Sequence, residues 1–329
     1  MRNLLTIVIL LGVALAIAAC GDTGKPSAGD AAKPARKLTI GVSIPAADHG
    51  WTAGVGWWAR QAMAMHPDVK WVYATADKPE KQIADIKDMM AQQKLDALVI
   101  LATESAPLTP IAKKVKANGI YIVNVDRGFL EPVADLFVEG DNEAFGRKSA
   151  EFVVGKLGGK GSIVVLEGIP STVNTDRVRA AMEVFKRHEG IKILGQQTGM
   201  WNRQKGMEVM QAFLTQHKKI DAVWAQDDDR AEGAEQAIRE AGRLDEMWML
   251  GGAGKKTIVK RVMDKDRLYP ADITYPPSMI AVGIHMAVSN LRDGQVDKIG
   301  QFMPRHVKLD VELITPANAK DYYFPDSVF

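Results

Sequence analysis

Polar and aromatic side chains follow several short apolar runs of this 329-residue chain. In "IYIVNVDRGF" the apolar run ends in an adjacent acid and base, Asp126 and Arg127. The other residues that stand in this position are Asp48, His49, Trp51, Asn174, Arg177, Trp201, Asp227 and Tyr275. Carboxylates accept hydrogen bonds, guanidinium groups donate them in pairs, and indole rings offer flat apolar faces. This combination suits a small polyhydroxylated ligand, whose hydroxyls both donate and accept.

Each of these residues, taken singly, also has an ordinary structural explanation. A Trp at a helix start is often buried in the core, an Asp or Asn there often caps the helix, and an isolated Arg is usually solvated. Their joint placement favours a ligand site, because open parallel sheets bind ligands outside the carboxyl ends of their strands.

Other chemistries find less support in the sequence. The glycine-rich "GGAGKKT" at residues 251–257 lacks two residues that a phosphate-binding loop needs, since Met249 and Lys256 occupy those positions, and a tight strand-to-helix turn is expected instead. The three adjacent acids at 227–229 point in different directions, the six histidines lack metal-binding spacing, and no serine nucleophile elbow is present. We therefore expect no enzyme, no metal site and no cofactor.

The elements that position these residues alternate between short apolar runs and longer amphipathic stretches. Strands are predicted at 38–44, 70–74, 97–101, 120–125 and 136–138, then at 162–167, 192–197, 222–225, 248–250 and 271–274. Helices are predicted at 51–65, 79–93, 108–118, 142–157, 175–188 and 204–217. Two successive sets of strand–helix units predict an α/β protein with two doubly wound parallel-sheet lobes. A late helix at 278–292 and a strand at 307–313 fit either lobe.

The start of the chain has a different character from the rest. Arg2, an apolar stretch to Ala19 and then Cys20 read as a secretory signal, and "IAAC" resembles a bacterial lipobox, whose cysteine receives lipid. Cys20 is the only cysteine, so it cannot form an internal disulfide. An ordinary signal cleaved nearby and an uncleaved anchor remain alternatives. Each version predicts an exported chain, with residues 21–36 as a flexible tether.

The composition limits the kinds of partner that the chain is expected to bind. The sequence is 47% hydrophobic and 25% charged, as globular proteins are, and its 42 basic and 40 acidic residues nearly cancel. Lys and Arg are spread along the chain, so we expect no nucleic-acid partner.

From about Lys37 to Leu313 the chain resembles the periplasmic sugar-binding proteins of type I fold, such as the ribose- and galactose-binding proteins of bacterial ABC importers. The resemblance rests on "GVSIPAADHGW", "IYIVNVDRGF", "DRVRAAMEVF", "GMWNRQKGMEVMQAFL" and "AVWAQDDDRAEGAEQAI", in this order. It implies two lobes joined by three crossovers, near Gly140, near Tyr275 and at 303–305. The first lobe would comprise 37–139 with about 276–302, and the second 140–275 with about 303–329.

The resemblance also implies roles for individual residues. First-loop contacts fall on His49 and Trp51 with Asp48 alongside, the hydroxyl-binding pair on Asp126 and Arg127, an aromatic wall on Trp201, and the Asn of an "AQND" stretch on Asp227. The second-lobe arginine falls on Arg177, with Arg179 as the alternative.

Two departures from the family pattern bear on the ligand. Ala253 stands where the family commonly has the Asp of a "GFDG" turn, and Tyr275 replaces a Gln before the last hinge. The resemblance therefore implies a less usual sugar, a polyol or a sugar derivative.

The resemblance implies a periplasmic protein, held at the membrane by its lipid anchor only, that delivers a sugar-like molecule to the permease subunits of an ABC transporter. A protein that presents its loaded form to a chemoreceptor or sensor kinase is one alternative, and a binder of a polyol, nucleoside or amino-acid derivative is another. A sugar-responsive repressor shares the fold but needs a DNA-binding helix-turn-helix where this chain has its export signal.

Overall fold

The computed structural model describes residues 37–292 and 304–329, all within one compact unit, Arg36–Phe329. The expected signal, the lipidation site Cys20 and the tether at 21–36 lie outside the described residues. Most of the expected third crossover at 303–305 is described, but residue 303 is not.

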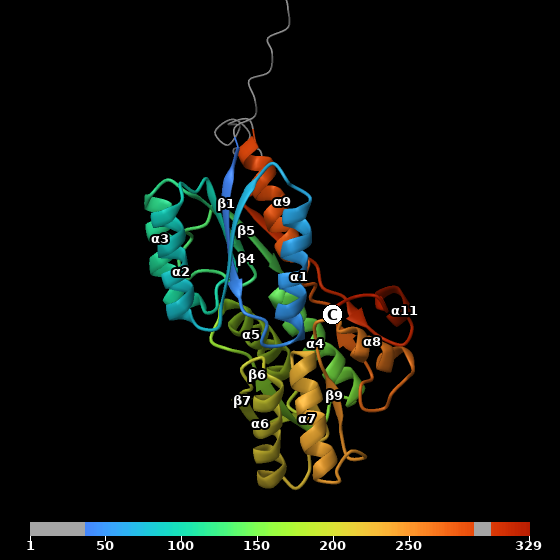
Figure 1. Ribbon diagram of the computed structural model, residues 1–329. Coiled ribbons are helices and arrows are strands. Elements are labelled where there is room, and N and C mark those ends of the chain that lie inside the picture. Colours follow the sequence, from blue (N-terminus) through green and yellow to red (C-terminus); the bar gives the residue numbers. More distant parts are fainter. Residues whose placement is uncertain (1–36, 293–303) are drawn as a thin grey trace, which may run out of the picture. The chain divides into compact units, whose positions relative to one another are not determined.

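The first lobe is built on a six-stranded parallel sheet with strand order β11-β5-β4-β3-β1-β2. Its strands are β1 Thr39–Pro45, β2 Lys70–Ala76, β3 Ala97–Ile100, β4 Tyr121–Val125, β5 Leu136–Gly140 and β11 His306–Leu309. Helices α1 Gly50–Ala64 and α9 Met279–Leu291 cover one face, and α2 Pro79–Gln92 and α3 Ser105–Ala117 the other (Figure 1). The order reverses at β1, so ligand-binding loops are expected at the ends of β1 and β3.

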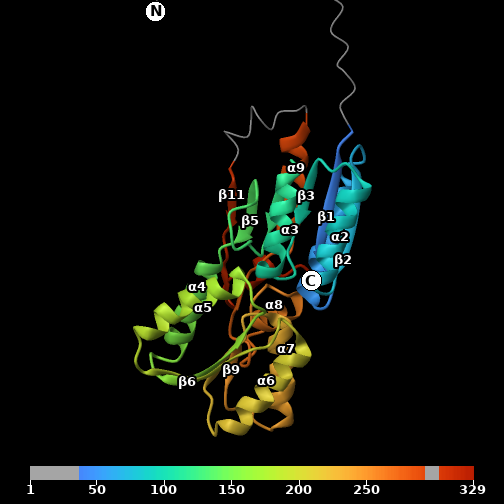
Figure 2. The ribbon, with the colours of Figure 1, turned by 90° about the vertical axis from the view of Figure 1, so that its left-hand side faces the viewer.

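The second lobe repeats this plan with a four-stranded parallel sheet of order β7-β6-β8-β9. Its strands are β6 Gly161–Glu167, β7 Ile191–Thr198, β8 Ala222–Trp224 and β9 Trp248–Leu250. Helices α4 Asn142–Lys156 and α5 Thr172–Lys186 pack on one face, and α6 Arg203–Gln216, α7 Asp228–Glu240 and α8 Lys256–Met263 on the other (Figure 2). Strand β10 Asp272–Ile273 pairs antiparallel with β12 Leu313–Ile314, and α11 Ala319–Tyr322 follows. The expected pair of doubly wound α/β lobes is confirmed.

Local signals in the sequence set several element boundaries. Asp141 precedes α4 and accepts a hydrogen bond from the Ala144 amide at 2.8 Å, as a helix cap does. Gly119 follows α3 with φ 72°, a left-handed conformation that favours glycine. The "GGAG" segment is the tight turn expected between a strand and a helix, because β9 ends at Leu250 and α8 begins at Lys256.

Several elements differ from the sequence prediction, and three of the differences have a visible cause in the sequence. Helix α3 begins at Ser105 rather than 108, because Pro107 lies in its first turn, where proline is tolerated. Helix α7 was not predicted, because its buried residues are mostly small or charged and give a weak apolar stripe. The single strand expected at 307–313 is two strands, β11 and β12. β11 pairs with β5 in the first sheet, whereas the expected division assigned residues from about 303 to the second lobe.

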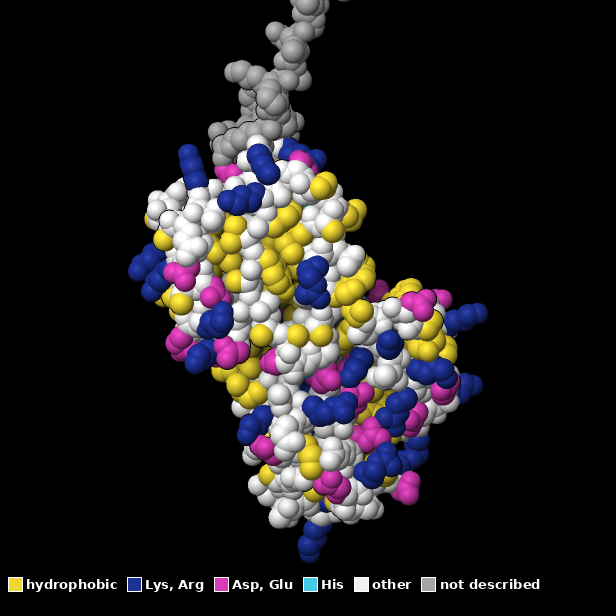
Figure 3. All heavy atoms as spheres, viewed as in Figure 1, with side chains coloured by type: hydrophobic (Ala, Val, Ile, Leu, Met, Phe, Trp, Pro, Cys, Tyr) yellow, Lys and Arg dark blue, Asp and Glu magenta, His cyan; other side chains and the backbone are white. Residues whose placement is uncertain are grey.

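Strand β2 leaves one edge of the first sheet open. Its residues Trp71, Val72, Tyr73 and Ala74 are all half-buried. Figure 3 shows hydrophobic side chains gathered on this part of the first lobe, between α1 and α2. The corresponding edge of the second sheet, β7, instead exposes several polar side chains. The two lobes share a plan but present different edges.

Candidate functional site

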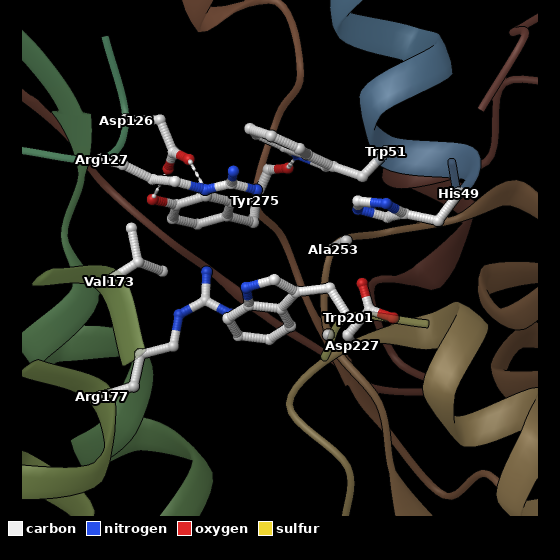
Figure 4. A pocket seen from close by; sticks show the side chains of 11 residues that line it. His49, Trp51, Asp126, Arg127, Val173, Arg177, Trp201, Asp227, Ala253 and Tyr275 are labelled. Carbon is white, nitrogen blue, oxygen red and sulfur yellow. Dashed lines mark hydrogen bonds and ion pairs between the residues drawn. The ribbon is translucent and has the colours of Figure 1, made fainter. Parts of the chain in front are cut away.

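A cavity lies where the carboxyl ends of strands from both lobes meet. Its lining comprises His49, Trp51, Asp126, Arg127, Val173, Arg177, Trp201, Asp227, Gly252, Ala253 and Tyr275, whose side chains converge in Figure 4. The lobes touch directly beside it: the Gly50 amide donates to Asp229 Oδ2 at 2.8 Å, and the Gly128 amide to Thr172 Oγ1 at 2.9 Å.

The first-lobe wall begins at the loop after β1. His49 stacks beside Trp51 with ring centroids 6.5 Å apart, and His49 Nδ1 lies 2.6 Å from Asp48 Oδ1. Trp51 donates its indole N–H to the Tyr275 carbonyl at 2.8 Å. This hydrogen bond holds the ring against the segment that follows β10. This side of the cavity is an aromatic surface held in one orientation.

Asp126, Arg127 and Tyr275 form the polar centre of the cavity. The Tyr275 hydroxyl donates to Asp126 Oδ1 at 2.6 Å, and Arg127 Nε lies 3.6 Å from Asp126 Oδ2. Arg127 Nη1 also donates to the carbonyls of Ala102 and Thr103. Burial raises the pKa of Asp126, while the Arg127 guanidinium opposes that rise.

Arg177 forms the second-lobe counterpart. Its Nε donates to Asn142 Oδ1 at 2.9 Å and its Nη1 to the Gln226 carbonyl at 3.0 Å. Its guanidinium lies 3.8 Å from the ring centroid of Phe145 and 4.3 Å from that of Tyr275. Burial lowers the pKa of Arg177. Arg179 instead points outward, half-exposed, and pairs with Glu143 and Asp176, so Arg177 is the arginine at the cavity.

Trp201 lines the cavity and packs against the guanidinium of Arg230, a contact that the sequence did not predict. The guanidinium of Arg230, in α7, lies 4.2 Å from the Trp201 ring centroid, and its Nε donates to the Ala225 carbonyl at 2.8 Å. Burial lowers the pKa of Arg230 to about 9. A Cβ at Gly168 would lie 1.9 Å from the indole, so only glycine leaves room for the ring there. Nothing in the charged run around Arg230 distinguished it from a solvated side chain.

Unusual backbone conformations gather around the cavity. Asp126, Trp201, Gln226 and Ala253 have φ of 65°, 53°, 58° and 141°, although none of them is glycine. Such conformations cost roughly 1–3 kcal/mol each and cluster at functional sites. Asp126, Trp201 and Ala253 line the cavity. Unfavourable backbone conformations are therefore concentrated at the residues that form its wall.

The three adjacent acids at the start of α7 each make a different set of hydrogen bonds. Asp227 caps the helix, accepting from the Arg230 amide at 2.9 Å, and also lines the cavity; burial raises its pKa. Asp228 accepts hydrogen bonds from the amides of Gly252 and Lys255 at 2.8 Å each, and Asp229 accepts one from the Lys255 ammonium. In residues 37–292 and 304–329, no group of three or more His, Cys, Asp or Glu side chains could hold a metal ion.

Asp228 and Asp272 form a buried carboxyl pair beneath the "GGAG" turn. The two groups interact with each other, and Asp272 Oδ1 is buried without a hydrogen-bond donor, which a proton on one of the two carboxyls would supply. Burial raises the pKa of Asp228 from 3.8 to about 7 and that of Asp272 well above its usual range. The folded state therefore holds protons that the unfolded chain has released, and this stabilisation is lost as pH rises from about 4 through about 7.

Two of the predicted site residues lie outside the cavity lining. Asp48 is more than half exposed and pairs with His49 at the rim. Asn174 accepts from the Gly168 amide and donates to Glu167 Oε2, each at 2.8 Å, so it holds the loop behind Trp201. Conversely, Val173 and Gly252 line the cavity without having been predicted. Val173 is one helix turn before Arg177 on α5, which is a signal that helical periodicity could have given.

Two α/β lobes, each built on a parallel sheet, meet around a polar and aromatic cavity. This arrangement defines a bilobal solute-binding architecture. The chain belongs to the periplasmic binding protein family, because its residues 40–295 match the family model described as a periplasmic binding protein domain.

Named relatives support this membership. The D-ribose/D-allose-binding protein of Pseudomonas aeruginosa is 30% identical over 241 residues, which cover 70% of this chain and 73% of that protein. The galactofuranose-binding protein YtfQ of Escherichia coli is 29% identical over 270 residues, which cover 79% of this chain and 84% of that protein.

Solved structures agree with the fold. A galactofuranose-binding protein superposes with a TM-score of 0.79 at 26% identity, covering 89% of this chain and 100% of that one. The fructose-binding periplasmic domain of a hybrid two-component system superposes with a TM-score of 0.78 at 29% identity, covering 86% and 92%. These relatives are solute-binding proteins rather than enzymes, which agrees with the expectation of no enzyme. Across the described part of the chain, no helix has the length and apolarity needed to cross a membrane.

Proposed function

We propose that this protein captures a sugar-like small molecule in the interlobe cavity and delivers it to the permease of an ABC importer. The observation that carries the proposal is the buried pairing of Asp126 with Arg127 and Tyr275 inside an aromatic cavity. Charged groups are expensive to bury, so a site that buries them without a catalytic arrangement is one built to recognise a polar ligand.

We infer distinct roles for the lining residues. Asp126 and Asp227 accept ligand hydroxyls, and Arg127 and Arg177 donate to ligand oxygens. The Trp201 ring packs against a C–H face of the ligand, as indole rings do on apolar surfaces.

The ligand class follows from this balance. The cavity offers acceptors, donors and rings in similar measure, which matches a neutral polyhydroxylated molecule. Ala253 supplies no acceptor where the family commonly has an acid, so the ligand is a less usual sugar, a polyol or a sugar derivative. The names of relatives that bind ribose, allose and galactofuranose support the class but do not choose within it.

A thermal-shift screen of monosaccharides, polyols and sugar acids tests this proposal. A ligand that binds only the folded state raises the melting temperature, by an amount that grows with its concentration above Kd. We expect a hit among these classes, confirmed by titration calorimetry. Hits confined to amino acids or nucleosides would contradict the sugar-like ligand.

A sensory role is the second candidate, because one structural relative is the periplasmic ligand-binding domain of a two-component system. Binding assays of the loaded protein against membranes that contain the permease, or a sensor kinase, separate the two roles.

We also propose periplasmic location with anchoring through a lipid on Cys20, which "IAAC" supports. Mass spectrometry of the purified protein would detect the lipid, and a chain that keeps residues 1–19 would contradict the anchor.

A further inference from the structure

The buried carboxyl pair beneath the "GGAG" turn lies behind one wall of the ligand cavity. Gly252 and Ala253 of this turn line the cavity, and so does Tyr275, which follows Asp272 after two intervening residues. We propose that Asp272 is a protonated, neutral carboxylic acid in the folded protein and a positioning residue for ligand binding. Its proton lies on Oδ1 and is donated to Asp228, and the pair holds the turn against Tyr275. This inference deepens the proposed function, on which its effect on ligand affinity rests.

Four successive backbone amides of the turn, at residues 252–255, are bonded to the pair or to β10. Asp228 accepts two of these amides at 2.8 Å each, and Asp272 Oδ2 accepts a third at 3.2 Å. The donors are, in the same order, the amides of Gly252, Lys255 and Gly254. The fourth amide, that of Ala253, donates to the Ile273 carbonyl at 2.7 Å. The carboxyl pair therefore accepts most of the amides that fix the shape of the turn.

The geometry leaves one oxygen of the pair without a donor. Both oxygens of Asp228 accept an amide, whereas Asp272 Oδ1 is buried and has no hydrogen-bond partner among the described residues. A Cβ at Gly251 would lie 2.2 Å from Asp228 Oδ1 and 3.4 Å from Asp272 Oδ1, so the two oxygens flank the same point. A proton satisfies both acceptors, because it turns one of them into a donor. The Lys255 ammonium does not neutralise the pair, since it is engaged by two other acids, Asp229 and Glu232.

The surroundings place the negative charge on Asp228 and the proton on Asp272. Asp228 is the first residue of α7, where the helix N-terminus favours a negative charge, and it has two amide donors against one for Asp272. Burial raises the pKa of Asp272 well above its usual range and that of Asp228 to about 7. Other titratable groups next to the pair lie in α7, in the turn and before β10: Asp227, Asp229, Lys255 and Tyr269. One proton on Asp272 Oδ1 gives every oxygen of the pair a hydrogen-bond partner.

The turn connects the pair to the aromatic wall of the cavity. The Tyr275 amide donates to the Ala253 carbonyl at 3.1 Å, and the Tyr275 carbonyl accepts the Trp51 indole N–H at 2.8 Å. At the end of the same side chain, the Tyr275 hydroxyl donates to Asp126 (Figure 4). A change in the carboxyl pair therefore reaches Trp51 and Asp126 through the backbone of Tyr275.

Paired variants test the position of the proton without any ligand. Asp272→Leu removes both the donor and the acceptor of Asp272, so the Trp51 indole N–H, followed by NMR, should exchange with solvent about tenfold or more faster. Asp272→Asn should restore slow exchange, because its amide N–H replaces the acid proton and its oxygen still accepts from Gly254. Asp228→Asn should exchange fast, since its NH₂ group would face a backbone N–H. If Asp228→Asn exchanges as slowly as wild type, or if Asp272→Leu does, the inference is wrong.

Infrared spectroscopy detects the proton directly. At neutral pH the difference spectrum between wild type and Asp272→Asn should contain the carbonyl band of a protonated carboxylic acid. A difference confined to carboxylate bands would overturn the assignment, and this measurement holds even if Asp272→Leu does not fold.

Asp221→Leu is the matched control for a general loss of stability. Asp221 also accepts a backbone amide, that of Ser162 at 2.7 Å, but it precedes β8 at the end opposite the cavity. This variant should leave the exchange of the Trp51 indole N–H unchanged. If it accelerates that exchange as much as Asp272→Leu does, the positioning role of Asp272 is refuted.

Titration calorimetry with D-ribose, D-allose, xylitol and myo-inositol separates this inference from the proposed function. For each of these that binds the wild type, Asp272→Leu should weaken the affinity about tenfold and Asp272→Asn should restore it. Equal affinities in wild type and Asp272→Leu would overturn the positioning role. If none of the four binds, the sugar-like ligand of the proposed function loses support, whereas the exchange and infrared measurements still decide the proton on Asp272.

Discussion

Gly168→Ala tests whether the Trp201 ring is the wall against which the ligand packs. A Cβ at position 168 would lie 1.9 and 2.1 Å from two atoms of the Trp201 ring. The φ at Gly168 is not in the left-handed region, so alanine fits the backbone and the conflict is with the ring alone. Ordinary van der Waals contact begins near 3.4 Å, so the indole must retreat by about 1.5 Å.

The displacement reaches the cavity because the ring has little other freedom. Arg230 packs 4.2 Å from its centroid, and Arg177 lies 5.3 Å from the same centroid. Overpacking of this kind costs about 1–3 kcal/mol of folding free energy, which a domain with about 5–15 kcal/mol of stability survives. We expect ligand affinity to fall by about ten- to a hundredfold, measured by titration calorimetry, since a shifted ring both loses its ligand contact and intrudes on the space.

Gly155→Ala is the matched control. Gly155 lies in α4, and a Cβ there would meet no atom within 4 Å. Alanine is the better helix former, by about 1 kcal/mol, so this variant should be slightly more stable and should bind the ligand like the wild type. If Gly168→Ala is folded, by circular dichroism, and keeps wild-type affinity, Trp201 is not a ligand wall.

Three further changes probe the site and its support. Asp126→Ala and Trp201→Ala should each weaken binding at least about tenfold, because each removes a buried ligand contact, and unchanged affinity in both by calorimetry would remove the site assignment. Arg177→Met should abolish measurable binding while Arg179→Met leaves it intact, since only Arg177 lines the cavity; equal affinities would contradict this. Asp272→Asn should be more stable relative to wild type at pH 8 than at pH 5, by denaturant unfolding, because Asp228 of the wild-type pair loses its proton beside Asp272 as pH rises through about 7; a pH-independent difference would refute the raised pKa of Asp228.

The site residues that directly follow strands could be predicted from the sequence. Asp126 and Arg127 follow a buried apolar run, and the structure brings them to the cavity beside Trp51 and Tyr275. The inference worked because in a doubly wound sheet the carboxyl ends of all strands meet at one edge, so position in the strand order is enough to predict proximity.

Contacts between side chains of elements far apart in the sequence could not be predicted in this way. The room that Gly168 leaves for Trp201, and the contact of Arg230 with that ring, depend on how the ends of β6 and β7 pack against α7. Helix α7 itself was missed because its close approach to α6 requires small residues: a Cβ at Gly233 would lie 2.0 Å from the Arg203 carbonyl. Small residues weaken the apolar periodicity from which a helix is predicted.

The cavity's arginines are anchored to corresponding places in the two lobes. Arg127 donates to carbonyls just after β3, and Arg177 and Arg230 donate to carbonyls just after β8. Strands β3 and β8 occupy equivalent positions in their sheets, each next to the lobe's first strand. Each guanidinium is thus held in place by the lobe's own backbone before any ligand arrives, which lowers the entropy lost on binding. Because these donors are held in place, we expect selectivity to depend on whether a ligand places its oxygens where the fixed N–H groups point.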